Sequence, residues 1–154
     1  MKSEWINPFI DATVTTCETM CGIKPVRNGA LRLHEELLTP DDLMGVLGLS
    51  GTVKGSVVLS MSVEMGILLV GKFVGETISQ NGSDLTDGFG ELLNIIAGAA
   101  VANIHGHKIT LSLPTVMIGH GNVIRNSKVG QCISIPMALP GMGEFSMYVS
   151  MVAG

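Results

Sequence analysis

The chain opens with apolar residues that recur every three or four positions, the spacing of one helix face. They are Ile10, Val14, Cys17 and Cys21. This pattern predicts a helix over residues 8–21, with Asn7 as its N-cap, Pro8 as its first residue and Gly22 just beyond its end.

A longer pattern of the same kind lies in the second half of the chain. Its apolar stripe consists of Leu85, Phe89, Leu92, Leu93, Ile96, Ala100 and Ile104. We predict a second long helix over residues 85–105, which Gly106 ends.

A shorter helix is predicted between these two, over residues 63–74, with Ser62 as its cap and Gly75 as its stop. Its expected buried stripe is Met65, Leu68, Leu69 and Phe73. Residues 76–84 are predicted to form a polar connector to the second long helix.

Alternating apolar and polar positions predict strands in the remaining segments. Residues 46–49 and 52–60 flank a Ser-Gly turn, which predicts a hairpin whose Val53, Val57 and Leu59 share one face. Further strands are predicted at residues 109–113, 129–139 and 144–152. In the last, Phe145, Met147, Val149 and Met151 alternate with Glu144, Ser146, Tyr148 and Ser150, a pattern typical of a half-buried strand with one outward face. The expected fold class is α+β, an antiparallel sheet packed with two long helices and a shorter one, in a single domain over residues 1–154.

Each half of the chain is a long helix followed by strands, and the two helices carry similar short motifs. Glu18-x-x-Cys21 in the first corresponds to Glu91-x-x-Asn94 in the second. Because only two positions match, a degenerate internal repeat and a chance likeness both remain open.

Charge is scarce in this sequence. Its 154 residues include 9 Lys+Arg and 13 Asp+Glu, a net charge of −4, and only 14% are charged, against about 25% in average domains. Such a surface indicates that another subunit or a partner covers part of it, and exposed edges of the C-terminal strands would allow self-association. Without a basic cluster, nucleic acid and anionic membranes are unexpected partners.

The start has no signal-peptide pattern and no stretch of about 18 uninterrupted apolar residues follows, so we expect a cytoplasmic protein without membrane insertion.

The cysteines and histidines do not form a recognisable metal or redox motif. Cys17, Cys21 and Cys132 are odd in number and lack a CxxC pair, which favours buried free thiols. The four histidines are His34, His105, His107 and His120, and no carboxylate or thiol completes a ligand set with them. We therefore expect no metal site in this chain.

The predicted helix over residues 85–105 has a polar side opposite its apolar stripe. Asp87, Glu91, Asn94, Gly98 and His105 lie on it, and Ile95 and Ala102 stand beside them. A solvated helix face is the simplest interpretation. However, Gly88, Gly90 and Gly98 each cost about 1 kcal/mol relative to Ala inside a helix. We interpret them as clearance that lets another molecule's backbone approach Glu91 and Asn94.

This helix resembles the signature helix of a known family. Asp87-x-x-x-Glu91-x-x-Asn94-x-x-x-Gly98 is similar to the motif of the CheX/CheC chemotaxis phosphatases. Segments 6–10, 49–60 and 113–116, with Gly119, resemble CheX segments at the same places in the chain. The single ExxN helix, with Cys21 where paired-motif members have a second Asn, resembles the CheX branch.

The resemblance implies an enzyme that hydrolyses the aspartyl-phosphate of a CheY-type response regulator. It implies that Asn94 orients the attacking water, that Glu91 anchors the partner's lysine, and that Asp87, Ile95 and Gly98 contribute to partner binding. The chain would need no cofactor of its own, because the response regulator supplies Mg²⁺. The family also implies a homodimer joined through its sheets.

Two other functions remain open at this stage. A non-catalytic module could use the same helix face to dock a response regulator or a flagellar switch component. A purely structural oligomer would leave the glycine-bordered polar face unexplained. Asn94 favours the enzyme, since a docking surface does not need an amide at the water-orienting position.

Overall fold

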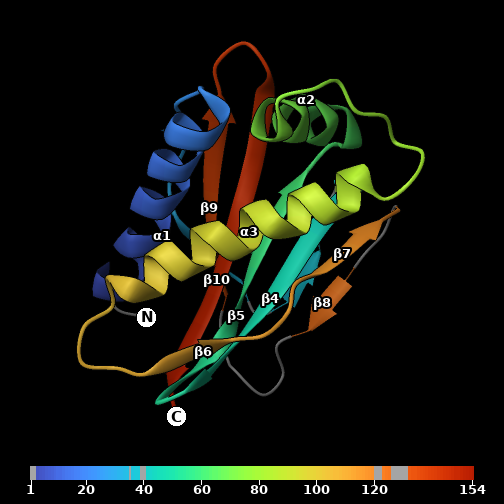
Figure 1. Ribbon diagram of the computed structural model, residues 1–154. Coiled ribbons are helices and arrows are strands. Elements are labelled where there is room, and N and C mark those ends of the chain that lie inside the picture. Colours follow the sequence, from blue (N-terminus) through green and yellow to red (C-terminus); the bar gives the residue numbers. More distant parts are fainter. Residues whose placement is uncertain (1–2, 35, 39–40, 120–122, 126–131) are drawn as a thin grey trace.

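Helices and strands are grouped along the chain, with each helical segment followed by a run of strands, and form an α+β fold as expected (Figure 1). The computed structural model describes residues 3–34, 36–38, 41–119, 123–125 and 132–154. Its helices are α1 (Ser3–Thr16), the π-helix η1 (Cys17–Cys21), α2 (Val63–Val74) and α3 (Asp84–Ala102). Its strands are β1 (Val26–Arg27), β2 (Arg32–His34), β3 (Glu36–Leu38), β4 (Leu43–Gly51), β5 (Val53–Met61), β6 (Ile109–Leu111), β7 (Thr115–Ile118), β8 (Val123–Arg125), β9 (Cys132–Leu139) and β10 (Gly143–Ala153).

The main sheet is antiparallel in every pairing described and has the strand order β1-β9-β10-β5-β4-β6. β2 also pairs with β9, β7 pairs with β4, and β3 and β8 form a separate two-stranded sheet. The predicted hairpin is confirmed as β4 and β5, paired from Leu43 with Met61 to Leu49 with Gly55. The expectation that the C-terminal strands expose edges is wrong for β10, which lies between β5 and β9.

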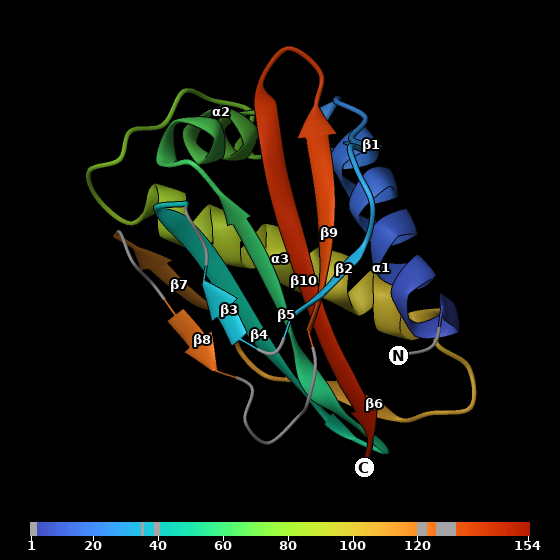
Figure 2. The same ribbon diagram turned by 180° about the vertical axis from the view of Figure 1, so that it is seen from behind.

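The three α-helices cover one face of the main sheet (Figure 1), and the β3–β8 pair lies on the opposite side (Figure 2). Buried apolar side chains of the helices and of β4, β5, β9 and β10 form the main core between the helices and the sheet. A smaller cluster of Met44, Val58, Cys132 and Tyr148 is buried apart from it. Tyr148 and Ser150 are therefore not on an outward face of β10, as the alternation suggested, because both faces of this central strand are covered.

The first helix begins five residues earlier than its sequence indicates. Pro8 lies inside α1, and Asn7 is not an N-cap. Pro8 has no N–H to donate to the preceding turn, but Trp5 and Ile6 in that turn are buried in the core, and their burial stabilises it. At the other end Gly22 stops the helix as predicted, with a φ of 70° and its N–H bonded to the Cys17 carbonyl.

The shorter helix has the predicted limits. The Ser62 hydroxyl accepts a hydrogen bond from the Met65 N–H, and Gly75 ends the helix with a φ of 80°. The predicted stripe is wrong at Leu68, which is 55% exposed. Gly66 faces the core instead, and a Cβ there would overlap the Leu43 side chain. The helix therefore makes its closest approach to the sheet at Gly66. Leu68, two residues further along, lies on the opposite side of the helix and faces outward.

Helix α3 buries six of the seven residues of the predicted apolar stripe, and the seventh, Ile104, is buried just beyond the helix end. It ends at Ala102 with Asn103 as its C-cap, so Ile104, His105 and Gly106 lie beyond it, contrary to the predicted end. Among the described residues, α3 alone is long and apolar enough by length and composition to cross a membrane. Half of that length is buried inside the protein, as is usual for a core helix.

Candidate functional site

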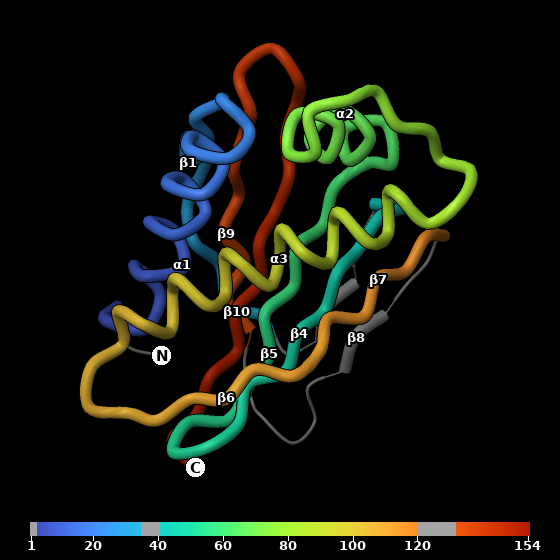
Figure 3. Tube along the Cα trace, in the orientation of Figure 1, coloured from blue at the N-terminus to red at the C-terminus, as the bar shows by residue number. Residues whose placement is uncertain are grey.

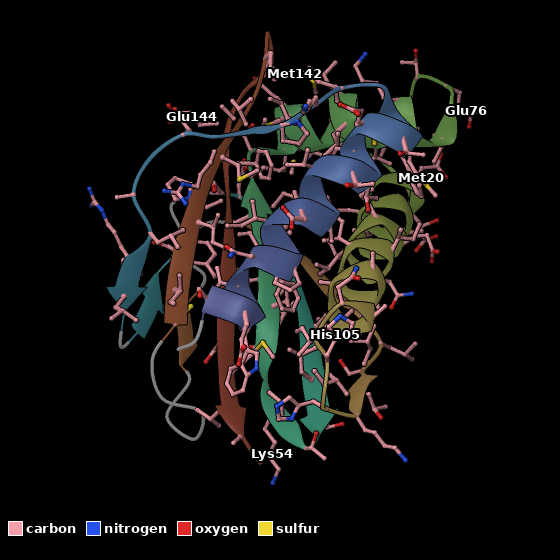
Figure 4. The ribbon with its side chains drawn as sticks, turned by 90° about the vertical axis from the view of Figure 1, so that its left-hand side faces the viewer. Met20, Lys54, Glu76, His105, Met142 and Glu144 are labelled. Carbon is pink, nitrogen blue, oxygen red and sulfur yellow. The ribbon has the colours of Figure 1, made fainter. Side chains whose placement is uncertain are left out.

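The outer face of α3 is the candidate site. Asp87 and Glu91 are exposed, and Asn94, Ile95 and Gly98 are partly exposed. Positions 87, 91, 94 and 98 lie three or four residues apart in one uninterrupted helix, so they occupy one side of it. His105 does not belong to this face, because the helix ends before it. Figure 4 shows it at the opposite end of the molecule from Glu76 and Met142.

The position of α3 is fixed by its close approach to the sheet. Gly45 of β4 faces the helix, and a Cβ there would lie 3.0 Å from Leu93 Cδ2 and 3.1 Å from Phe89 Cε2. Both of these side chains are fully buried. The helix is therefore packed tightly against β4 on one side, and its opposite face is presented at the surface.

The polar side chains of this face are available to another molecule. Neither the Asn94 amide nor the Glu91 carboxylate makes a hydrogen bond or ion pair with any described residue. Asn103, the C-cap of this helix, differs, because its Nδ2 donates to the Ala99 carbonyl at 3.1 Å. An amide has donors and an acceptor to satisfy, and those of Asn94 have no partner within the described part of the chain.

The structure corrects the interpretation of the α3 glycines. A Cβ at Gly88 would overlap Val70 Cγ1, so Gly88 serves the contact between α3 and α2. A Cβ at Gly90 would lie 3.4 Å from Pro114 Cγ, so Gly90 faces the chain that follows β6. Gly98 has the most open surroundings of the three, since a Cβ there would have only Leu111 Cδ1 within 4 Å, at 3.9 Å. Internal packing therefore requires a glycine at position 88. Because Gly90 is buried, clearance for a partner is left to Gly98.

The two short motifs have different surroundings. Glu18 is exposed, as Glu91 is, but Cys21 is buried in η1, whereas Asn94 is partly exposed. The pair in the first helix therefore does not present an acid and a polar side chain together at the surface. Both motifs therefore have an exposed acid, and they differ at the second position, which is buried in the first motif and partly exposed in the second.

The three cysteines are free and buried, as predicted. A hydrogen bond from the Cys17 thiol to the Cys21 sulfur, together with burial, raises the pKa of Cys17. The same bond lowers the pKa of Cys21, and the nearby Lys72 ammonium adds to that effect. Burial raises the pKa of Cys132 to about 11. None of these thiols lies on α3.

Two of the histidines have structural contacts. His34 Nε2 is 2.8 Å from the Ser134 hydroxyl, and His107 Nδ1 is 3.1 Å from that of Thr52. His120 lies outside the described residues. Within the described ranges, no three His, Cys, Asp or Glu side chains are grouped so that they could hold a metal ion.

Sequence reasoning missed one residue beside the site. Leu113, predicted as the end of a strand, lies beyond β6 and is 90% exposed. The only signal in the sequence was an apolar residue directly before Pro114, where strand alternation stops.

Comparisons with known proteins agree on one family. The family model described as chemotaxis phosphatase CheX matches residues 43–138, which include all of α3. The CheY-P phosphatase CheX of Thermotoga maritima is 24% identical over 157 residues, covering 100% of this chain and 99% of the relative. A crystal structure of CheX from Desulfovibrio desulfuricans is 27% identical, with a TM-score of 0.84, and 97% of this chain and 99% of that one are covered.

A third similar structure is that of a CheX–CheY–BeF3–Mg²⁺ complex from Borrelia burgdorferi. It is 21% identical with a TM-score of 0.70, and 96% of this chain and 97% of that chain are covered. At this identity the likeness establishes the shared fold.

Proposed function

The chain belongs to the CheX family of chemotaxis phosphatases, and on that premise we propose that it hydrolyses the aspartyl-phosphate of a CheY-type response regulator. The full-length likeness to a CheY-P phosphatase supports this activity. The observation that carries the proposal is Asn94, a partly exposed amide without a partner among the described residues, held on a rigid helix.

Asn94 is suited to the chemical step because an acyl phosphate is already activated. Hydrolysis then chiefly requires a water molecule held in line with phosphorus. The Asn94 oxygen can accept a hydrogen bond from that water, and its nitrogen can donate to it. An amide does this without changing its protonation state. The chain therefore needs no nucleophile of its own.

Glu91 lies one helical turn from Asn94 and is proposed to anchor the partner. Its exposed carboxylate would pair with the lysine of the response regulator's phosphorylation site, a charge-assisted contact made only in the complex. Asp87 adds negative charge beside it, and Gly98 leaves room for the partner's backbone. In this proposal the response regulator's own Mg²⁺ and lysine supply charge stabilisation.

Asn94→Ala tests this assignment. We expect dephosphorylation of an acetyl-phosphate-treated response regulator to slow by about 100-fold, by analogy with loss of an oxyanion-hole donor. Thermal stability should hold or rise, because Ala is the better helix former and Asn94 contributes no internal hydrogen bond. Phosphate release measures the first expectation and circular dichroism measures the second.

Asn103→Ala is the matched control. It removes the amide of the C-cap of the same helix, which donates to the Ala99 carbonyl, so it should lower the melting temperature slightly and leave the rate unchanged. A stable Asn94→Ala protein that still binds but is inactive would separate chemistry from docking. Full activity of Asn94→Ala would contradict the proposal and favour the docking module.

A further inference from the structure

Leu113 is the most exposed large apolar side chain in the described part of the chain, at 90%. A leucine in water contributes no burial energy to this fold. It also lies next to the candidate site rather than at a chain end. Both features call for an explanation outside the folded monomer.

Leu113 is held in place by its neighbours. The Ser112 N–H donates to the Gly48 carbonyl at 2.9 Å, and the Gly48 N–H donates to the Ser112 hydroxyl at 2.8 Å. That hydroxyl in turn donates to the Leu113 carbonyl at 3.1 Å. On the other side Pro114 packs near Gly90 of α3. The exposed side chain therefore projects from a fixed backbone, which lowers the entropy lost when a partner covers it.

The segment from β6 to β7, which includes Leu113, runs beside α3 (Figure 3). Leu111 Cδ1 lies 3.9 Å from the Cβ position of Gly98, and Pro114 Cγ lies 3.4 Å from that of Gly90. Positions 90, 94 and 98 follow one another at one-turn intervals on the same side of the helix. Leu113, between Leu111 and Pro114, therefore lies alongside the turn that carries Asn94.

We infer that Leu113 is an apolar anchor that inserts into a hydrophobic patch beside the phosphorylated aspartate of the response regulator. The inference rests on the proposed function. Ile95 lies on the other side of Glu91 and is partly exposed, so apolar groups flank the polar pair on both sides. Such groups exclude water around central polar contacts.

The response regulator is the occupant that fits this surface. A second copy of the chain seated on Leu113 would also cover the turn of α3 with Asn94 and block the site. The acidic Asp87 and Glu91 beside it complement a basic group next to a bound phosphoryl group, whereas a second copy would bring the same negative charges.

The test compares Leu113→Ala with Leu68→Ala, a leucine on α2 that is 55% exposed. Dephosphorylation is followed over a range of response-regulator concentrations, with the regulator phosphorylated by acetyl phosphate. We expect Leu113→Ala to raise KM about tenfold with kcat unchanged, as for loss of an interface anchor. Leu68→Ala should match the parent in both. Melting temperature should stay unchanged for both variants, since each side chain is exposed.

The possible results distinguish a failure of the Leu113 inference from a failure of the proposed function. An unchanged KM for Leu113→Ala, with an active parent protein, overturns the inference and leaves the proposed function standing. A fall in kcat at unchanged KM also overturns it, because Leu113 would then act on the site rather than on binding. An effect on self-association in sedimentation, with KM unchanged, would assign Leu113 to a second copy of this chain. If the parent protein itself does not accelerate phosphate loss, the proposed function fails first.

Discussion

At the scale of single residues, Glu91 is assigned a role through its charge. Glu91→Lys should weaken binding to the response regulator, because two like charges would face each other where a carboxylate and a lysine are proposed to pair. The fold should be unaffected, since the side chain is exposed and unpaired among the described residues. A titration of the phosphorylated regulator against each protein measures the effect.

Glu18→Lys provides the control for this charge reversal, because Glu18 is an exposed acid in the corresponding motif of the first helix. It should bind like the parent, since its companion Cys21 is buried. Equal binding by Glu91→Lys and the parent would remove Glu91 from the anchoring role. Weaker binding by Glu18→Lys would mean that the first motif still contacts the partner.

At the scale of elements, α3 contains two glycines, Gly88 and Gly98, whose replacement by alanine should change stability in opposite directions. Gly88→Ala should destabilise the protein by about 1–3 kcal/mol, because the new methyl group overlaps Val70 of α2. Gly98→Ala should stabilise it by up to about 1 kcal/mol, since its surroundings are open and Ala favours the helix. Chemical denaturation measures both.

Binding separates the two glycines further. If Gly98 gives clearance to the partner's backbone, Gly98→Ala should bind the response regulator less tightly although the protein itself is more stable. Tighter or equal binding would show that the partner does not approach Gly98. In that case no glycine of α3 would keep the role that the sequence suggested.

The elements that could be predicted are those whose signal is local. The stripe of α3 and the Ser62 cap of α2 follow from residue spacing and from one hydroxyl, and both are confirmed. The failures depend on contacts between elements. Pro8 lies inside α1 because the turn before it is buried, and Leu68 faces outward because Gly66 approaches the sheet.

In the candidate site, too, only the features that depend on local sequence could be predicted. The one-sided arrangement of Asp87, Glu91, Asn94 and Gly98 follows from helical periodicity alone. The surroundings of Gly88 and Gly90 could not be predicted, because Val70 and Pro114 lie in other segments of the chain. The position of Leu113 beside α3 also depends on the pairing of β6 and β7 with β4.

At the scale of the whole molecule, the two ends of the main sheet differ in what they adjoin. One end, with β6 and β7, lies beside α3 and the proposed partner surface. The other end has the short strands β1 and β2 paired with β9 (Figure 2). It exposes Val26, Leu31 and Leu33 at 50%, 37% and 58%. We propose that a homodimer forms through this second end, which keeps both copies of α3 accessible.

Leu33→Asp tests the dimer, because a charge at this position would have to be buried without a partner in the interface. Sedimentation at micromolar concentration should show a dimer for the parent and a monomer for the variant. Leu68→Asp, an equally exposed position on α2, should remain dimeric. Phosphatase activity per subunit should persist in the Leu33→Asp monomer, since the proposed catalytic residues lie on the part of α3 beside β6 and β7, away from β1 and β2. A parent protein that sediments only as a monomer would contradict the dimer, and a dimeric Leu33→Asp would place the interface elsewhere.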